Sequence, residues 1–147
     1  MISSKDNDFI KHIKKLKDKK YRDEEKEYII EGIKLIEEAI NEKVNIKQIV
    51  ICEECSKTTD IPKNLMYEIA KYNCIYVTEK VFKSITQVTT PQGIFAIIEK
   101  TILNEEEVDY TQDIILALDD IQDPGNLGTI LRTVDSVGLN QILISKG

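Results

Sequence analysis

One stretch constrains this chain more than any other: residues 119–132, DDIQDPGNLGTILR, directly after the apolar run at 114–118. A helix-like apolar pattern begins near Leu127. The segment therefore predicts a buried strand, a turn rich in Gly, Asn and Pro, and then an amphipathic helix. In α/β proteins this succession builds sites at the carboxyl ends of strands.

Composition favours a globular protein of modest size. The 147 residues, 41% hydrophobic and 31% charged, allow one ordinary domain, or a small domain plus part of another. The run at 114–118 is far shorter than the roughly 20 residues that cross a bilayer. The N-terminus, MISSKDNDF, has no apolar segment behind a basic one, so no secretory signal is apparent and we expect a cytoplasmic location with no membrane partner.

Charge is distributed unevenly along the chain. The net charge is −6, but residues 1–22 carry eight Lys or Arg against three Asp, a balance of +5 that leaves −11 for the rest. Such a basic segment can contact phosphates, although a solvated lysine-rich helix face is as common. His12 lies in this segment, and we expect it to do no chemistry. The candidate RNA contacts here are Lys14, Lys15, Lys19, Lys20 and Arg22.

No metal or redox site is expected. Three cysteines without an export signal argue against structural disulfides. Cys52 and Cys55 have C-x-x-C spacing, but a third Cys and one distant His are poor support for zinc, and the two acidic residues between the thiols should raise the pKa of both. The acidic residues Asp119, Asp120 and Asp123 suggest a metal cluster, yet such residues more often cap turns.

The first hundred residues alternate between helical and extended patterns. Phe9, Ile13 and Leu16 at helical spacing, for example, predict an amphipathic helix over 6–17. This alternation predicts an α/β domain of about 100 residues. Further helices are expected over 33–40, 62–70 and 79–85, and strands over 28–30, 46–52, 75–77 and 93–98.

The remainder divides into a linker and a shorter folded segment. Residues 101–112 are polar and acidic without a sustained period, which is typical of an interdomain linker. Beyond it, a strand at 113–118, a helix at 127–137 and a strand at 141–144 predict one βαβ unit. The predicted organisation is therefore a domain at 1–100, a linker at 101–112 and a partial domain at 113–147.

The turn closely resembles a known signature. Asp123-Pro124-Gly125-Asn126-Leu127-Gly128, with Arg132-Thr133 and Gly138, is similar to the first motif of the SpoU (TrmH-type) ribose 2′-O-methyltransferases of RNA. Ile30-Glu31-Gly32, Glu38-Ala39 and Thr90-Pro91-Gln92-Gly93-Ile94 resemble the substrate-binding domain ahead of many SpoU catalytic domains, which is similar to the RNA-binding proteins L30e and L7Ae. The resemblance implies an L30e-like α/β domain followed by the first βαβ unit of an incomplete SPOUT (trefoil-knot) domain.

The resemblance also assigns site residues. It implies that Arg132 serves catalysis and that Asn126 holds the loop. An Arg offers a rigid fork of donors to a phosphate or oxyanion, and the missing side chain of Gly128, one turn earlier, leaves space for a ribose in front of it. Asn126 suits the helix N-cap. The alternatives are that Arg132 pairs with Asp135 or Asp119 and that Asn126 is only a cap.

Cofactor and partners follow from the same resemblance. It implies S-adenosylmethionine as methyl donor, RNA (rRNA before tRNA) as substrate, and a homodimer for the full-length form. The family holds its cofactor in the knot with motifs like Asn-Glu-x-x-Gly and Ser-Leu-Asn-x-Ser, and neither occurs here. We therefore expect no cofactor-binding residue and no metal in this chain, a fragment that is inactive alone. The alternative is a stand-alone L30e-like RNA-binding module without catalysis.

Overall fold

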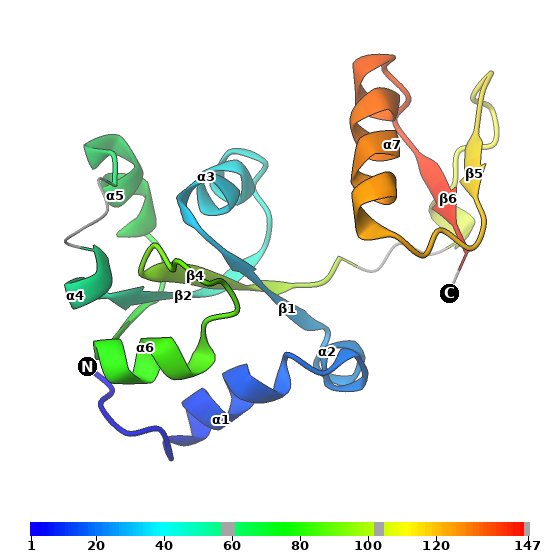
Figure 1. The fold of residues 1–147 in the computed structure, drawn as a ribbon. Coiled ribbons are helices and arrows are strands. Elements are labelled where there is room, and N and C mark those ends of the chain that lie inside the picture. Colours follow the sequence, from blue (N-terminus) through cyan, green and yellow to red (C-terminus); the bar gives the residue numbers. More distant parts are fainter. Residues whose placement is uncertain (57–60, 102–104, 146–147) are drawn as a thin grey trace. The chain divides into compact units, whose positions relative to one another are not determined.

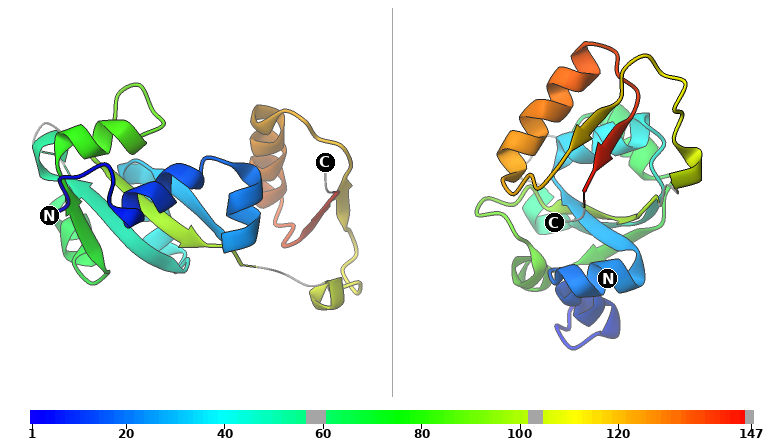
Figure 2. Two further views of the ribbon diagram at one scale, coloured as in Figure 1. Left: turned by 90° about the horizontal axis from the view of Figure 1, so that it is seen from below. Right: turned by 90° about the vertical axis from the view of Figure 1, so that its right-hand side faces the viewer.

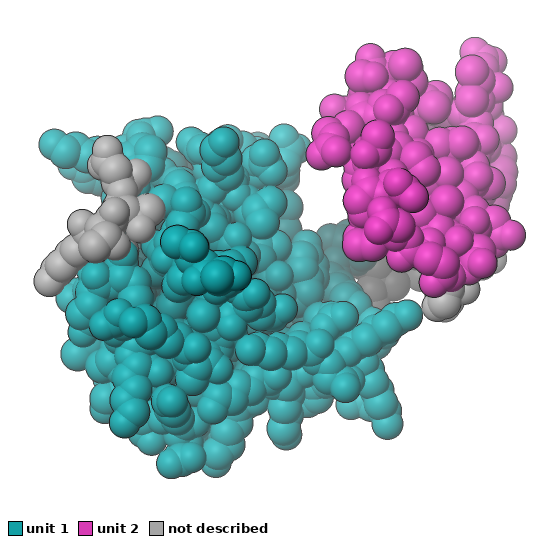
Figure 3. Space-filling model, viewed as in Figure 1, with its two compact units in different colours: residues 1–101 teal, residues 102–147 magenta. Residues whose placement is uncertain are grey.

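The computed structural model describes residues 1–56, 61–101 and 105–145. The chain forms two compact units, residues 1–101 and residues 102–147, which Figure 3 colours separately.

A four-stranded sheet organises unit 1. Its strand order is β1 (Glu27–Glu31), β4 (Ile94–Glu99), β2 (Ile46–Cys52) and β3 (Cys74–Val77), as Figure 1 shows. β4 runs antiparallel to both β1 and β2, whereas β2 and β3 are parallel. Five of the six residues of β4 are buried, because helices cover both faces of the sheet.

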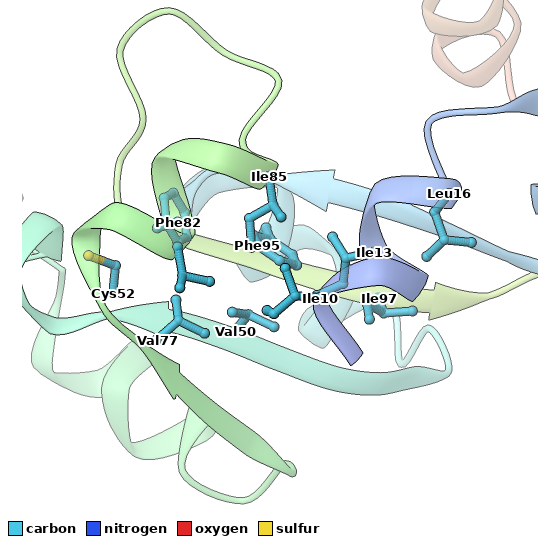
Figure 4. Close-up of a cluster of buried hydrophobic side chains, with 11 residues drawn as sticks. Ile10, Ile13, Leu16, Val50, Cys52, Val77, Phe82, Ile85, Phe95 and Ile97 are labelled. Carbon is cyan, nitrogen blue, oxygen red and sulfur yellow. The ribbon is translucent and has the colours of Figure 1, made fainter. Parts of the chain in front are cut away.

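Two hydrophobic clusters fill the two sides of this sheet. On one side, α1 (Asp8–Lys15) and α6 (Glu79–Ile85) pack through Ile10, Ile13 and Phe82 against Phe95 (Figure 4). On the other side, α3 (Ile33–Asn41) and α5 (Lys63–Ile69) pack against alternate residues of the same strands. Unit 1 is thus a three-layer α/β structure. Two short helices, α2 (Lys19–Glu25) and α4 (Glu53–Ser56), complete it.

Unit 2 is a small βαβ arrangement. The parallel strands β5 (Leu116–Leu118) and β6 (Ile142–Ile144) are joined by α7 (Pro124–Ser136), which lies along one face of the pair in both views of Figure 2. A 3₁₀ turn, η1 (Glu105–Glu107), precedes them. Of the described residues in this unit, only Leu118 and Val134 reach the core.

The α/β class and most predicted elements are confirmed. Two short helices were not predicted: α2 buries no residue, and α4 is four residues long, so neither carries an apolar period. The strand predicted at 113–118 occupies only residues 116–118. Part of the predicted linker, residues 102–104, lies outside the described residues. No described helix has the length and apolar character that a membrane crossing requires.

Candidate functional site

The turn before α7 is organised by Asp123, not by Asn126. Asp123 has extended backbone angles, and its Oδ1 accepts a hydrogen bond from the Asn126 N–H at 2.7 Å. Pro124 occupies the first helical position, where its missing N–H costs nothing. The prediction that Asn126 is the N-cap is therefore wrong. A carboxylate followed by Pro starts the helix three residues earlier, and the anion is favoured at a helix N-terminus.

Gly125 and Gly128, on either side of Asn126, have different surroundings. A Cβ at Gly125 would lie 3.0 Å from Asp123 Oδ1, so Gly125 leaves room for the cap. A Cβ at Gly128 would meet nothing within 4 Å. Packing of the described residues does not demand a glycine at 128, and this position of the helix surface is open to a ligand.

Arg132 is exposed on the polar face of α7. The hydroxyls of Thr129, Thr133 and Ser136 donate to backbone carbonyls of their own helix at 2.7–3.0 Å. Within the described part of the chain, no acidic side chain lies within ion-pair distance of the Arg132 guanidinium, so the alternative pairings with Asp135 and Asp119 are not formed. The guanidinium faces solvent.

Two of the three Asp residues before α7, Asp120 and Asp123, shape the turn. Asp120 adopts a left-handed conformation (φ 52°), and its carboxylate accepts a hydrogen bond from the Gln122 amide. Its backbone N–H donates to Ser145 Oγ at 3.0 Å. Among the described residues, no group of three His, Cys, Asp or Glu is placed to hold a metal ion. Asp123 is therefore the helix cap, and Asp120 takes part in the turn that precedes it.

The basic segment of unit 1 is divided between two helices. Lys14 and Lys15 lie on α1, and Lys15 Nζ stands 5.4 Å from the centroid of the Tyr21 ring. Lys19, Lys20 and Arg22 lie on α2, where Lys20 Nζ is 3.9 Å from Glu24.

Arg22 differs from these lysines because its guanidinium has backbone partners. Nη1 donates to the carbonyl oxygens of Leu16 at 3.1 Å and Lys17 at 2.7 Å, at the C-terminal end of α1. Cations at this position satisfy the free carbonyls of a helix end. Arg22 therefore holds the corner between α1 and α2.

A buried charged network lies beneath α1, and no local pattern in the sequence indicates it. The Glu27 side chain is 6% exposed and accepts hydrogen bonds from Lys47 Nζ and, at 2.7 Å, from His12 Nε2. His12 Nδ1 lies 2.9 Å from Tyr21 Oη. Burial by itself raises the pKa of Glu27, but the hydrogen bonds from Lys47 and His12 outweigh it and hold that pKa below its ordinary value of 4.5.

Two of the three short motifs of unit 1, Ile30-Glu31-Gly32 and Thr90-Pro91-Gln92-Gly93-Ile94, meet at one edge of the sheet. Glu31 accepts hydrogen bonds from the Thr86 hydroxyl and, at 3.0 Å, from the Gln87 N–H. Gln92 Oε1 accepts from the Ile33 N–H at 2.8 Å. The loop between α6 and β4 is therefore fastened at both ends to the residues around Gly32.

Cys52 lies in the core, whereas Cys55 and Cys74 are half-buried. Cys52 is fully buried at the end of β2, and its Sγ accepts a hydrogen bond from the Cys55 N–H at 3.2 Å. Burial, followed by the neighbouring Cys55 thiol, raises the pKa of Cys52 to about 12. The predicted direction is confirmed for Cys52, but the main cause is burial rather than the adjacent acidic residues.

Comparison with known proteins places this geometry in a family. The model of the MRM3-like substrate binding domain matches residues 7–96. The 23S rRNA (guanosine(2553)-2′-O)-methyltransferase RlmP of Bacillus subtilis is 36% identical over 146 residues, covering 99% of this chain and 54% of that protein. The mitochondrial rRNA methyltransferase 3 of Xenopus tropicalis is 32% identical over 138 residues, covering 89% of this chain and 32% of that protein.

Solved structures agree in fold. The AdoMet-bound rRNA methyltransferase from Sinorhizobium meliloti superposes with a TM-score of 0.77 at 30% identity, covering 99% of this chain and 54% of that one. The SpoU methyltransferase AviRb from Streptomyces viridochromogenes gives a TM-score of 0.74 over 94% of this chain and 52% of its own, and at 15% identity it supports the fold alone.

The chain thus spans about half the length of the bacterial relatives it matches, and the match continues through both units. This continuity disfavours the alternative of a stand-alone RNA-binding module. Because the family model covers more than half of the sequence, the chain belongs to the MRM3-like substrate-binding domain family, and the relatives that it matches at 30% identity or more are rRNA methyltransferases.

Proposed function

We propose that this chain supplies the RNA-binding domain and the first part of the catalytic domain of an rRNA ribose 2′-O-methyltransferase. One observation carries the proposal: a single alignment of 146 residues joins both units to a 23S rRNA 2′-O-methyltransferase at 36% identity. Residues 1–100 would bind the RNA, residues 101–112 would link the domains, and residues 113–147 would begin the SPOUT domain.

For ribose 2′-O-methylation, this chain would need to supply positioning and charge stabilisation rather than a strong base. Methylation of a ribose 2′-hydroxyl requires that hydroxyl to be held in line with the methyl group while its proton leaves. Arg132 is exposed, and its guanidinium offers a positive charge and a planar fork of N–H donors. In the proposal it binds the phosphate or the developing oxyanion beside the reacting ribose.

Asn126 and Gly128 would shape the approach to Arg132. Asn126 lies in the first turn of α7, where Asp123 fixes its backbone, and its side chain is exposed. Gly128 lies one turn before Arg132, and its surface is open. We assign Asn126 to holding the substrate loop and Gly128 to admitting the ribose.

S-adenosylmethionine supplies the methyl group in this reaction. The described residues of unit 2 do not fit it by themselves. A concavity of about 490 Å³ in this unit is lined mainly by apolar residues of the β5–β6 pair, such as Leu118 and Leu143, with Asp119 as its one charged side chain among those described. A charged sulfonium cofactor needs an enclosed pocket with several polar groups. We place its binding residues outside the described part of this chain.

The partners and location are part of the proposal. The substrate would be rRNA before tRNA, the longer form would be a homodimer, and the compartment would be the cytoplasm. Sedimentation equilibrium on the longer form would measure its mass, and a monomer at micromolar concentration would contradict the dimer.

Two measurements test the main proposal. Filter binding of the 147-residue chain to structured rRNA fragments and to DNA of equal length, at stated salt, should favour RNA. A chain extended to the relatives' length should transfer a labelled methyl group from S-adenosylmethionine to a ribose 2′-hydroxyl of rRNA. A label recovered on a base instead of a ribose would contradict the proposed reaction.

A further inference from the structure

A β-bulge in β2 places two consecutive polar residues on one face of the sheet. Ile46 pairs with Ile98, and Gln48 pairs with Ile97, so Lys47 is the extra residue. The Ile46 side chain packs in the cluster beneath α3 and α5. The Val50 side chain packs in the other cluster, beneath α1 and α6. Bulges redirect side chains in this way and occur often beside functional sites. Here the bulge brings both Lys47 and Gln48 beneath α1.

These two side chains line a cavity of about 190 Å³. Ile97 of β4 lies beneath it, Phe9 and His12 of α1 border it, and Glu27 of β1 provides a buried carboxylate. At roughly 30 Å³ per water, the cavity offers the room of about six waters. That space suits one planar ring and excludes a whole nucleotide.

The lining selects a ring with N–H donors rather than an anion. A buried carboxylate repels a phosphate, but each of its oxygens can accept a second hydrogen bond beyond those from Lys47 and His12. The side-chain amide of Gln48 has no hydrogen-bond partner among the described residues. Phe9 adds an aromatic face on which a base can stack.

The surroundings of the cavity carry the opposite charge. Lys11, Lys14 and Lys15 lie on α1, the helix that carries Phe9 and His12, in the only strongly basic segment of an acidic sequence. Of these, Lys15 lies one turn after His12 and stands over Tyr21, Lys11 forms an ion pair with Asp8 at 3.0 Å, and Lys14 has no ion-pair partner among the described residues. Basic side chains around an aromatic-lined pocket are the combination by which proteins bind unpaired RNA.

We propose that this cavity takes one unpaired RNA base that presents N–H donors, while the lysines of α1 hold the adjacent phosphates. The inference rests on the proposed function, because it names the RNA feature that unit 1 binds. Guanine fits best, since adjacent N1–H and N2–H donors can meet a carboxylate side by side. Uracil offers a single N–H between two carbonyl oxygens and fits worst.

The first test measures binding of single-stranded RNA by fluorescence anisotropy over a range of salt concentrations. Phe9→Leu and Gln48→Met should each weaken binding about five- to tenfold without changing the salt slope, since neither contacts a phosphate. The matched control is Tyr67→Leu, which removes an aromatic that is 75% exposed on α5. It should bind like the unchanged protein. Gln48→Met keeps the side-chain length, so it tests the cavity even if Phe9→Leu impairs packing.

The second test observes the cavity directly. Guanosine 5′-monophosphate should shift the NMR signal of the Ile97 δ1-methyl through ring currents, and uridine 5′-monophosphate should shift it less. If the chain binds RNA while both cavity variants match the Tyr67→Leu control and the methyl signal stays in place, the cavity assignment is overturned. If the chain binds no RNA at low salt, the proposed function fails instead.

Discussion

The side chain of Gln92 accepts a hydrogen bond from the backbone N–H of Ile33 at 2.8 Å, across 59 residues of sequence. It thereby caps α3, whose own N-cap residue, Gly32, has no side chain to do so. Gly32 has φ 112°, and a Cβ there would lie 3.1 Å from Gln92 Oε1. Two of the three short motifs that resemble the SpoU substrate-binding domain, those containing Gly32 and Gln92, thus form one capped corner.

We predict that Gln92→Ala destabilises unit 1. Loss of a helix cap costs about 1 kcal/mol, which lowers the melting temperature of a unit this size by roughly 4–8 °C. Gln87→Ala, an exposed residue of the same loop, is the control and should leave the transition unchanged. Equal melting temperatures for both variants by circular dichroism would show that the cap is dispensable.

The buried Glu27 should make stability depend on pH. Its pKa in the folded state is below the ordinary value of 4.5, so its ionised form stabilises the fold above that value. As pH falls through the lowered folded-state pKa, this contribution is lost. Urea unfolding from pH 7 to pH 3 should therefore show the unchanged protein losing more stability than Glu27→Gln.

The control for this pH series is Glu42→Gln, which changes an exposed carboxylate. It should follow the unchanged protein across the whole range. Parallel curves for the unchanged protein and Glu27→Gln would mean that the network around Glu27 contributes no pH-dependent stability.

The strands and longer helices could be predicted from sequence because their apolar residues recur at the period of the element. Glu79–Ile85 and Ile46–Cys52 were located to the residue. The Glu27 network could not be predicted, because its members come from three elements and a bulge sets the direction of Lys47. No local sequence pattern indicates that these side chains lie together in the fold.

The site before α7 illustrates the same limit. The motif and the adjacent strand predict which residues form this site. Which of them caps α7 depends on where the helix begins, and residue type alone does not decide that. Asn126 and Asp123 are both good N-cap residues, and Pro124 after Asp123 decides between them. For Arg22, charge suggested an RNA contact, whereas the carbonyls that it binds become neighbours only once α1 and α2 have formed.

Experiments should therefore distinguish the structural role of Arg22 from the RNA-binding role proposed for the lysines of α1. Arg22→Gln should lower stability by about 1 kcal/mol, because two carbonyl oxygens at the end of α1 lose a charged donor. The double variant Lys14→Gln, Lys15→Gln should instead weaken RNA binding and reduce the salt slope by about 1.4 for single-stranded RNA. An unchanged slope in the double variant would locate the phosphate contacts elsewhere.

Limited proteolysis should separate the two units. The compact units meet at residues 101 and 102, and residues such as Tyr110, which is 69% exposed, offer a protease access. We expect early cuts between residues 100 and 112 and a protected core comprising unit 1. Mass spectrometry of the fragments would identify the cut sites. A resistant fragment that spans this segment would argue against the proposed linker.

Arg132 should matter to methyl transfer and not to folding. It is exposed, and within the described chain it has no ion-pair partner, so Arg132→Ala should leave the melting temperature of the 147-residue chain unchanged. In a chain extended to the relatives' length, the same change should lower the transfer rate by about 10²–10³, the usual cost of removing one donor to a developing oxyanion. Cofactor affinity should persist. Ser136→Ala, whose hydroxyl bonds only to its own helix, is the control and should retain activity. Full activity in the Arg132→Ala enzyme, measured by transfer of a labelled methyl group, would remove Arg132 from the proposed site.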